Sequence, residues 1–240
     1  MRFDIVTIFP QLLEHAMQYG VLGRALDSGL LRVGVHNLRD YCHDRHRQVD
    51  DTPYGGGPGM VMKPEPFFEA VNALRTDGHG EARVVLLSPQ GQAFDQETAR
   101  RLSRCSRMIL LCARYEGVDE RVRETLVDEE ISIGDYVLSG GEFAALVVMD
   151  AVARMVDGVL GNEQSADQES HAQGLLEYPQ YTRPATYNGL AVPDILIHGH
   201  HEQIRYWRRL QALKRTLQRR PDLLGRAELT DEDWQILGTL

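Results

Sequence analysis

The stretch around which the rest of the chain is arranged reads Ile131-Ser-Ile-Gly-Asp-Tyr-Val-Leu-Ser-Gly-Gly-Glu142. It begins with β-branched apolar residues, as the end of a buried strand does, and glycines interrupt it at Gly134 and at Gly140-Gly141. Such breaks around an apolar run predict a loop whose backbone turns tightly or lies very close to another group. Two interpretations are open: an ordinary connection from a strand to a helix, or a loop whose backbone binds a flat, partly apolar ligand such as adenine.

Strand and helix patterns alternate on both sides of this stretch. Apolar runs typical of strands cover residues 3–10, 31–35, 83–88 and 107–113, and we expect Pro10 and Pro89 to end the first and third of them. Helices are expected over 12–26, 67–74, 95–104, 120–127 and 142–156, with Asp95 as a candidate N-cap. Strands that alternate with helices predict an α/β fold, with a mostly parallel sheet covered by helices on both faces.

Ligands of parallel sheets bind at the carboxyl ends of the strands. Three loops of this chain follow predicted strands, at residues 88–91, 113–117 and 134–141. Their expected convergence at one edge of the sheet favours the ligand-binding interpretation of the opening stretch over the ordinary connection.

Residues 39–63 show neither a helix nor a strand pattern and contain the run Pro53-Tyr-Gly-Gly-Gly-Pro-Gly59. A long irregular segment inside a compact domain is usually functional or disordered. No Gly-Lys-Ser/Thr follows the glycines, so the run is not a P-loop. His43 and His46 have no cysteine or further histidine at metal-binding spacing, and we predict hydrogen-bonded or solvated histidines and no metal site.

The composition is that of an ordinary globular protein, with 240 residues, of which 42% are hydrophobic and 25% charged. The formal net charge of −9 excludes a chain that is basic all over but not a local basic patch. No apolar run approaches the length of a membrane span, the N-terminus lacks the layout of a signal peptide, and the three cysteines form no CxxC pair. We therefore expect a cytoplasmic protein with reduced thiols and no membrane contact.

The composition changes after residue 160. Residues 161–174 lack apolar periodicity and are typical of a mobile linker, which separates a first domain of residues 1–160 from a second of residues 175–240. Residues 205–220 contain seven basic residues and no acidic one. They form either a solvated amphipathic helix or a surface for RNA phosphates, and the single sign of the charge favours RNA.

Several longer motifs follow one another along the chain. They are Val49-Asp-Asp-Thr-Pro-Tyr-Gly-Gly-Gly-Pro-Gly-Met60, Leu87-Ser-Pro-Gln-Gly91, Arg114-Tyr-Glu-Gly117, Ser132-Ile-Gly-Asp-Tyr-Val-Leu138, Asp150-Ala-Val-Ala-Arg154, Tyr181-Thr-Arg-Pro184 and His198-Gly-His-His201 with Trp207-Arg208. With these motifs the chain resembles, over essentially its whole length, the bacterial tRNA (guanine-N1)-methyltransferases of the SPOUT class. The resemblance implies transfer of a methyl group from S-adenosylmethionine to N1 of the guanosine at tRNA position 37, just 3′ of the anticodon. A non-catalytic RNA-binding protein and a SPOUT enzyme that methylates a ribose 2′-hydroxyl are the alternatives.

The resemblance also implies features that periodicity does not reveal. It implies a trefoil knot near the carboxyl end of the first domain, which is a rare topology, and a small, mainly helical second domain that binds the anticodon stem-loop of tRNA. It further implies a homodimer in which both subunits contribute to each active site. S-adenosylmethionine would lie among the three loops identified above. The implied donor-binding residues are Pro89, Ala113, Tyr115, Gly117, Ser132, Ile133, Gly134, Asp135, Tyr136, Val137, Leu138, Gly140 and Gly141.

Methylation of guanine N1 needs a base, because this nitrogen carries a proton at neutral pH, and a donor for the negative charge that grows on O6. By resemblance, Glu169 is the base, Arg154 stabilises O6, and Glu116 holds the methyl donor or the target base. The family usually has aspartate where Glu169 stands and glycine where Ala113 stands, and Asp167 is the alternative base. A magnesium ion is compatible with this chemistry, but the sequence shows no ligand set for it. The residues expected to contact RNA are Asp50, Tyr54, Gly55, Gly59, Arg183, His201, Arg208 and Arg215.

Overall fold

The computed structural model describes residues 1–161 and 169–240. The chain divides into two compact units, Met1–Gly161 and Asn162–Leu240. Half of the expected linker, residues 162–168, lies outside the described residues.

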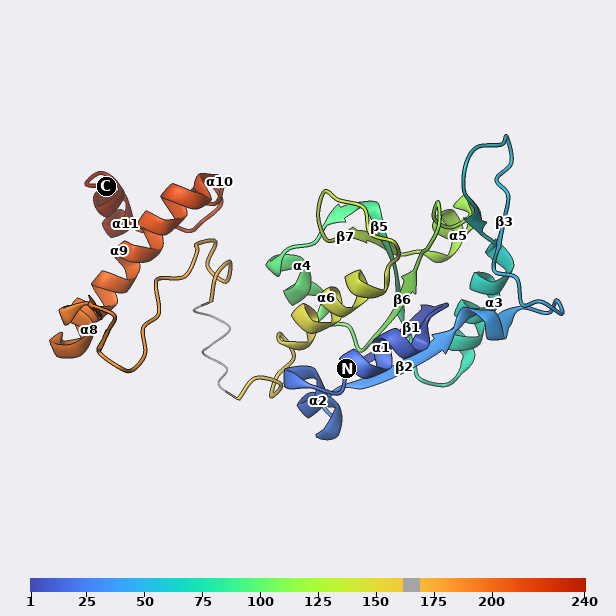
Figure 1. Ribbon diagram of the computed structural model, residues 1–240, viewed down its shortest axis with the longest axis horizontal. Helices are drawn as coiled ribbons and strands as arrows, with labels where there is room; N and C mark the ends of the chain where they lie inside the picture. Colours follow the sequence, from blue (N-terminus) through green and yellow to red (C-terminus); the bar gives the residue numbers. More distant parts are fainter. Residues whose placement is uncertain (162–168) are drawn as a thin grey trace. The chain divides into compact units, whose positions relative to one another are not determined.

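A five-stranded sheet in the order β2-β1-β6-β5-β7 forms the centre of the first unit (Figure 1). Its strands are β1 (Arg2–Thr7), β2 (Arg32–Asn37), β5 (Arg83–Ala93), β6 (Arg107–Cys112) and β7 (Glu129–Ser132). Neighbouring strands pair in parallel throughout the sheet, which confirms the prediction. Every residue of the central strand β6 is buried, because such a strand is covered on both faces.

Helices cover both faces of this sheet, as the alternating pattern predicts. On one face α1 (Pro10–Ala16), α2 (Gly20–Asp27), α4 (Gln96–Leu102) and α6 (Glu142–Ala153) share one apolar core with the strands. On the other face the short 3-10 helix η1 (Leu38–Tyr41), α3 (Pro64–Thr76) and α5 (Glu120–Leu126) form a second core. Pro10 begins α1. The Asp95 side chain caps α4 by accepting a hydrogen bond from the Thr98 N–H at 2.8 Å, which confirms the predicted N-cap.

Several predicted element boundaries are wrong. The strand expected over 3–10 ends at Thr7, and the helix expected over 142–156 ends at Ala153. The single helix expected over 12–26 is two helices, because Tyr19 is extended and Gly20 has a φ of +70°, which takes the chain out of the helical conformation between α1 and α2. β5 does not end at Pro89 but resumes beyond it, and the register shifts so that Leu87 and Gln92 both pair with Ile131 of β7. Residues 88–91 therefore protrude from the strand as a bulge.

A buried ionic cluster joins β1 and β6 near their amino ends. Asp4 and Arg107 are 0% and 1% exposed, and Arg107 Nε donates to Asp4 Oδ2 at 2.8 Å. Burial alone would raise the pKa of Asp4, but hydrogen bonds from His36, Arg2 and Arg107 outweigh burial and hold this pKa far below its usual range. The charged cluster thus fixes the relative position of two strands whose opposite ends reach the candidate site.

The second unit consists mainly of helices: α8 (Asp194–His198), α9 (His201–Arg219), α10 (Pro221–Leu224) and α11 (Asp231–Leu237). A short hairpin of β8 (Thr186–Tyr187) and β9 (Leu190–Ala191) precedes them. It turns at Asn188-Gly189, where both residues have a positive φ, the conformation that this dipeptide favours in tight hairpins.

The core of the second unit is small and centres on Leu175, Leu213 and Ile236. The backbone N–H of Leu176 donates to Thr216 Oγ1 at 2.9 Å, which holds the segment before the hairpin against α9. This contact makes α9 the element around which the unit is built.

Candidate active site

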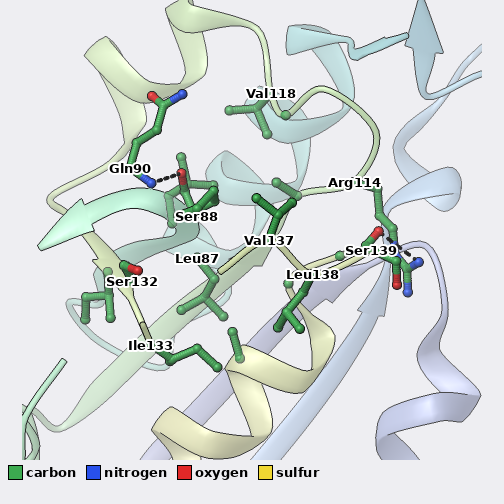
Figure 2. A pocket seen from close by; sticks show the side chains of 18 of the residues that line it. Leu87, Ser88, Gln90, Arg114, Val118, Ser132, Ile133, Val137, Leu138 and Ser139 are labelled. Carbon is green, nitrogen blue, oxygen red and sulfur yellow. Dashed lines mark hydrogen bonds between the residues drawn. The ribbon is translucent and has the colours of Figure 1, made fainter. Parts of the chain in front are cut away.

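The loops that follow β6 and β7 and the bulge of β5 converge on one cavity at the carboxyl edge of the sheet. The space inside it, including the part open to solvent, is about 940 Å³. Figure 2 shows Ser88 and Gln90 on one side and Arg114 and Ser139 on the other, with Val137 between them. The structure therefore brings together the three loops expected to meet. Every residue that the resemblance assigned to donor binding lines this cavity except Asp135.

The bulge of β5 supplies one wall. Its conformation is set locally, because the Gln90 N–H donates to Ser88 Oγ at 3.1 Å (Figure 2). Gly91 closes the bulge, and a Cβ there would lie 2.5 Å from the backbone nitrogen of Ile131. Only glycine lets β5 pair again with β7 at this point. The glycine of the Ser88–Gly91 motif is therefore required by the packing of the two strands, and the motif also lies beside the cavity.

The loop after β6 has a strained backbone. Tyr115 has a φ of +59° and Gly117 a φ of +108°, and the Gly117 N–H donates to the Arg114 C=O at 3.0 Å. A non-glycine residue at positive φ costs free energy and is often found at functional sites. Here the turn presents Tyr115, whose side chain is half exposed, and Glu116 at the cavity.

The glycine run, residues 53–59, lies directly against the loop of residues 113–117. The short strands β3 (Asp50–Asp51) and β4 (Val61–Met62) pair at its base, and Tyr54 at its tip is fully exposed. The Glu116 N–H donates to the Met60 C=O at 2.9 Å, and a Cβ at Gly59 would overlap the Glu116 carboxylate. The segment expected to contact RNA and the loop expected to bind the methyl donor are therefore neighbours within the first unit.

An ion pair that the sequence analysis did not identify holds the edge of the cavity. Glu142 is 0% exposed, and its carboxylate accepts hydrogen bonds from Arg114 Nε at 3.0 Å and from the Thr7 hydroxyl at 2.7 Å. The Arg114 guanidinium also donates to the Ser139 C=O at 3.1 Å and lies 4.5 Å from the centre of the Phe9 ring. A carboxylate can be buried only when such partners satisfy it. The network ties the ends of β1 and β6 to the loop between β7 and α6.

Gly140 and Gly141 are required by this same packing. The loop pairs with the end of β6 through a bridge between Arg114 and Gly140 and a hydrogen bond from the Gly141 N–H to the Ala113 C=O at 2.9 Å. A Cβ at Gly140 would overlap the Arg114 side chain, and one at Gly141 would lie 2.8 Å from the Cα of Cys112. The close approach predicted from the glycines is thus made, at least in part, by the protein's own chain.

Cys112 lies at the end of β6 but is not a nucleophile. Burial raises the pKa of its thiol well above the usual range, and the negative charge of Glu142 raises it further. The thiol therefore stays protonated and serves packing.

The two residues to which the resemblance assigned the chemistry belong to different units. Arg154 is the C-cap of α6 in the first unit. Glu169 lies at the start of the described part of the second unit, where its backbone C=O accepts a hydrogen bond from the Ala172 N–H at 3.2 Å. The alternative base, Asp167, lies outside the described residues.

The expected RNA-contacting residues of the tail all belong to the second unit. The Arg208 guanidinium lies 4.9 Å from the centre of the Tyr178 ring, and Arg215 donates to the Glu177 C=O at 3.1 Å. At least one basic residue of the stretch 205–220 has an acidic partner: Arg209 forms an ion pair with Asp233 at 2.7 Å. Arg183 and His201 are exposed.

Residues 1–161 and 169–240 contain neither a cluster of metal-ligating side chains nor a helix that could span a membrane. No cluster of three or more His, Cys, Asp or Glu side chains there is arranged to hold a metal ion. No helix in the same residues combines the length and the apolar character needed to cross a bilayer.

Known proteins match this chain along nearly its whole length. The family model described as tRNA (Guanine-1)-methyltransferase TrmD matches residues 1–226. A relative from Dictyoglomus turgidum, named tRNA (guanine-N(1)-)-methyltransferase, is 54% identical over 237 residues, which are 99% of this chain and 95% of the relative. A relative of the same name from Chloroflexus aggregans is 56% identical over 227 residues, which are 95% of this chain and 89% of the relative. Another from Dehalococcoides mccartyi is 50% identical over 237 residues, which are 99% of this chain and 96% of the relative. The chain therefore belongs to the tRNA (guanine-1)-methyltransferase family.

Proposed function

We propose that this protein transfers a methyl group to N1 of the guanosine at tRNA position 37. One observation carries the proposal: in a chain of this family, the loops after β6 and β7 and the bulge of β5 line one cavity, and the exposed glycine run adjoins that cavity at Glu116. A site for a methyl donor and a segment that can approach RNA closely thus lie side by side.

The donor that we propose is S-adenosylmethionine, and the residues around the cavity suit it. Apolar side chains such as Leu87, Ile133 and Leu138 line it beside glycine backbone, which is a suitable surface for adenine. Glu116 adds a carboxylate that can attract a positively charged amino group. When bound, the donor supplies an electrophilic methyl group to the guanine.

In the proposed reaction, the carboxylate of Glu169 would take the N1 proton, and the electron pair left on N1 would bond to the methyl carbon. The methyl–sulfur bond of the donor would break, with its electron pair staying on sulfur as a neutral thioether. The guanidinium of Arg154 stabilises the negative charge that grows on O6. Because these two residues belong to different units, the reaction needs both units of the chain. The strained turn at Tyr115 and Glu116 positions the donor and the target base.

We further propose a homodimer. The helix α6 lies in the core on one side, and on its other side Phe143 and Val147 are 51% and 46% exposed, beside the exposed Asp150. The neighbouring helix α1 exposes Leu12, and Phe9 immediately before it is also exposed. Exposed apolar side chains on neighbouring helices are typical of a protein–protein interface, and a second subunit would cover them. A monomer in sedimentation equilibrium at micromolar concentration would contradict this.

The trefoil knot and the tRNA-binding role of the second unit are parts of the same proposal. The return of the loop before α6 to pair with the residues just after β6 supports a knot. The basic face of α9 supports contact with RNA phosphates. A tRNA substrate and three free thiols support a cytoplasmic location.

Incubation with labelled S-adenosylmethionine and tRNA transcripts that carry G or A at position 37 tests the function. We expect label in the G37 transcript alone, at N1 of the base after nuclease digestion. Equal labelling of both transcripts would contradict base methylation, and label in a ribose would favour the 2′-O-methyltransferase. RNA binding without any transfer would favour a non-catalytic binder.

A further inference from the structure

A second hollow lies within the second unit, far along the chain from the residues of the donor cavity. It is formed by the segment 178–185, by Val192 after the hairpin, and by α8 and α9. Its aromatic and charged lining residues are Tyr178, Tyr181, Arg183, Trp207 and Arg208. The space inside, including the part open to solvent, is about 970 Å³. This is enough room for a single planar ring system of nucleobase size.

The aromatic side chains leave ring surface available in this hollow. The rings of Tyr181 and Trp207 meet at a tilt of 52° with their centres 6.4 Å apart, so they do not stack on each other face to face. Tyr181 is 49% exposed, although both rings line the hollow. An aromatic face that is open to solvent at the wall of a hollow is a stacking surface for a planar ligand.

The charge of the lining identifies the kind of ligand. Arg183 and Arg208 line the hollow, and no acidic residue of the described part of the chain does. Contact with the Tyr178 ring holds the Arg208 guanidinium in place. Aromatic faces that take bases, together with cations that take the backbone phosphates, are the combination by which proteins bind unpaired nucleotides. A neutral apolar peptide would have no use for the two cations.

We propose that this hollow holds an unpaired base of the tRNA other than the guanine that is methylated, stacked on Tyr181 or Trp207, with Arg183 and Arg208 at the adjoining phosphates. The inference rests on the proposed function for the identity of the RNA. The base bound here is not the one that reacts, because none of the described residues that line the hollow has a carboxylate to accept the N1 proton.

The two tryptophans of the chain provide the test, because Trp207 lines the hollow, whereas Trp234 on α11 does not and is 60% exposed. Trp234→Phe leaves Trp207 as the reporter, and Trp207→Phe leaves Trp234. The probes are an anticodon stem-loop RNA and a blunt RNA duplex of the same length. We expect saturable quenching of Trp207 by the stem-loop but not by the duplex, and little change at Trp234 with either RNA.

Affinity gives a second measurement. Trp207→Leu should weaken binding of the stem-loop roughly tenfold, within the range known for loss of one base–aromatic stack. Arg208→Gln, which leaves the rings in place, should keep the quenching and lower the slope of affinity against salt. Equal quenching by the duplex, or unchanged stem-loop affinity of a folded Trp207→Leu protein, would overturn the inference. Loss of the oligomeric state in the Trp207→Leu protein, with its RNA affinity unchanged, would also overturn the inference. A protein partner would then occupy the hollow.

This inference and the proposed function can fail separately. Methyl transfer to G37 without quenching of Trp207 would remove the base site and leave the enzyme intact. Quenching by the stem-loop without methyl transfer would support the base site and contradict the proposed function.

Discussion

Replacing Glu142 with glutamine is expected to lower the free energy of unfolding of the first unit by about 3 kcal/mol. The Glu142 and Arg114 side chains are 0% and 18% exposed, so solvent screens the ion pair very little. Removal of one member of a buried pair costs about 3–5 kcal/mol, because the other charge is left without its partner. The lower end of this range applies, since the glutamine amide oxygen can still accept a hydrogen bond from Arg114 or from the Thr7 hydroxyl.

Urea denaturation followed by circular dichroism measures this change. Both tryptophans lie in the second unit, so their fluorescence follows that unit separately, and its transition should move less. Glu69→Gln is the matched control: its partner is His43, the two side chains are 42% and 81% exposed, and such exposed pairs contribute about 0–1 kcal/mol.

A double variant separates the lost ion pair from other effects of the substitution. Adding Arg114→Met to Glu142→Gln removes the charge that the single variant leaves without a partner, so the second substitution should cost less than Arg114→Met does alone. If the free energies of unfolding of the Glu142→Gln and Glu69→Gln proteins differ by less than about 0.5 kcal/mol, the buried-pair reasoning is wrong. The same single variant should also bind S-adenosylmethionine more weakly, because the loop before α6 loses its tether.

Three further outcomes are expected. Gly141→Ala should weaken donor binding, measured by calorimetry, because its Cβ would lie 2.8 Å from the backbone of β6, whereas Gly161→Ala, whose Cβ meets nothing within 4 Å, should leave it unchanged. Glu169→Gln should nearly abolish single-turnover methylation with donor binding intact, and Asp167→Asn should matter little; the opposite result would reassign the base. An arginine partner lowers the pKa of Asp233 to about 2 from its ordinary 3.8, so its stabilisation is complete above about pH 4 and disappears as the pH falls towards 2. Asp233→Asn should therefore lower the melting temperature followed by tryptophan fluorescence at pH 6, and this difference from the native protein should shrink at pH 2.

The parallel sheet and the meeting of three of its loops at one edge could be predicted because they depend on local patterns. A central parallel strand must be apolar on both faces, and the run at 107–113 shows this directly. Once the strands are known to be parallel, their carboxyl ends meet at one edge, and the loops that follow them converge. The N-cap at Asp95 is local in the same sense, since it needs only one side chain and an N–H three residues away.

The break between α1 and α2 could not be predicted from periodicity. Leu13 and Met17 of the first segment and Leu22 of the second all bury in the same core, so their helical spacing continues across the break. The break itself depends on one dihedral angle, the positive φ of Gly20, which glycine allows but does not require.

The ion pair at the edge of the cavity escaped the sequence analysis for another reason. Arg114 and Glu142 are 28 residues apart, and neither belongs to a repeating pattern. A weak signal was present, because each charged residue stands directly beside a buried element and must find a partner there. Which partner it finds depends on the path of the loop between β7 and α6, and that path follows from tertiary packing.

The glycines around the cavity at the carboxyl edge of the sheet have a consequence for inhibitors. Gly117 and Gly134 have positive φ values of +108° and +150°, and a Cβ at Gly140 or Gly141 would meet the chain itself. Each position is therefore closed to other residues for reasons that do not involve the ligand. A drug molecule that hydrogen-bonds to the backbone at these glycines would contact atoms that a point mutation cannot replace. Resistance would have to arise instead at side chains such as Leu87 or Val137, and a compound that makes little contact with those side chains would leave few mutations through which resistance could arise.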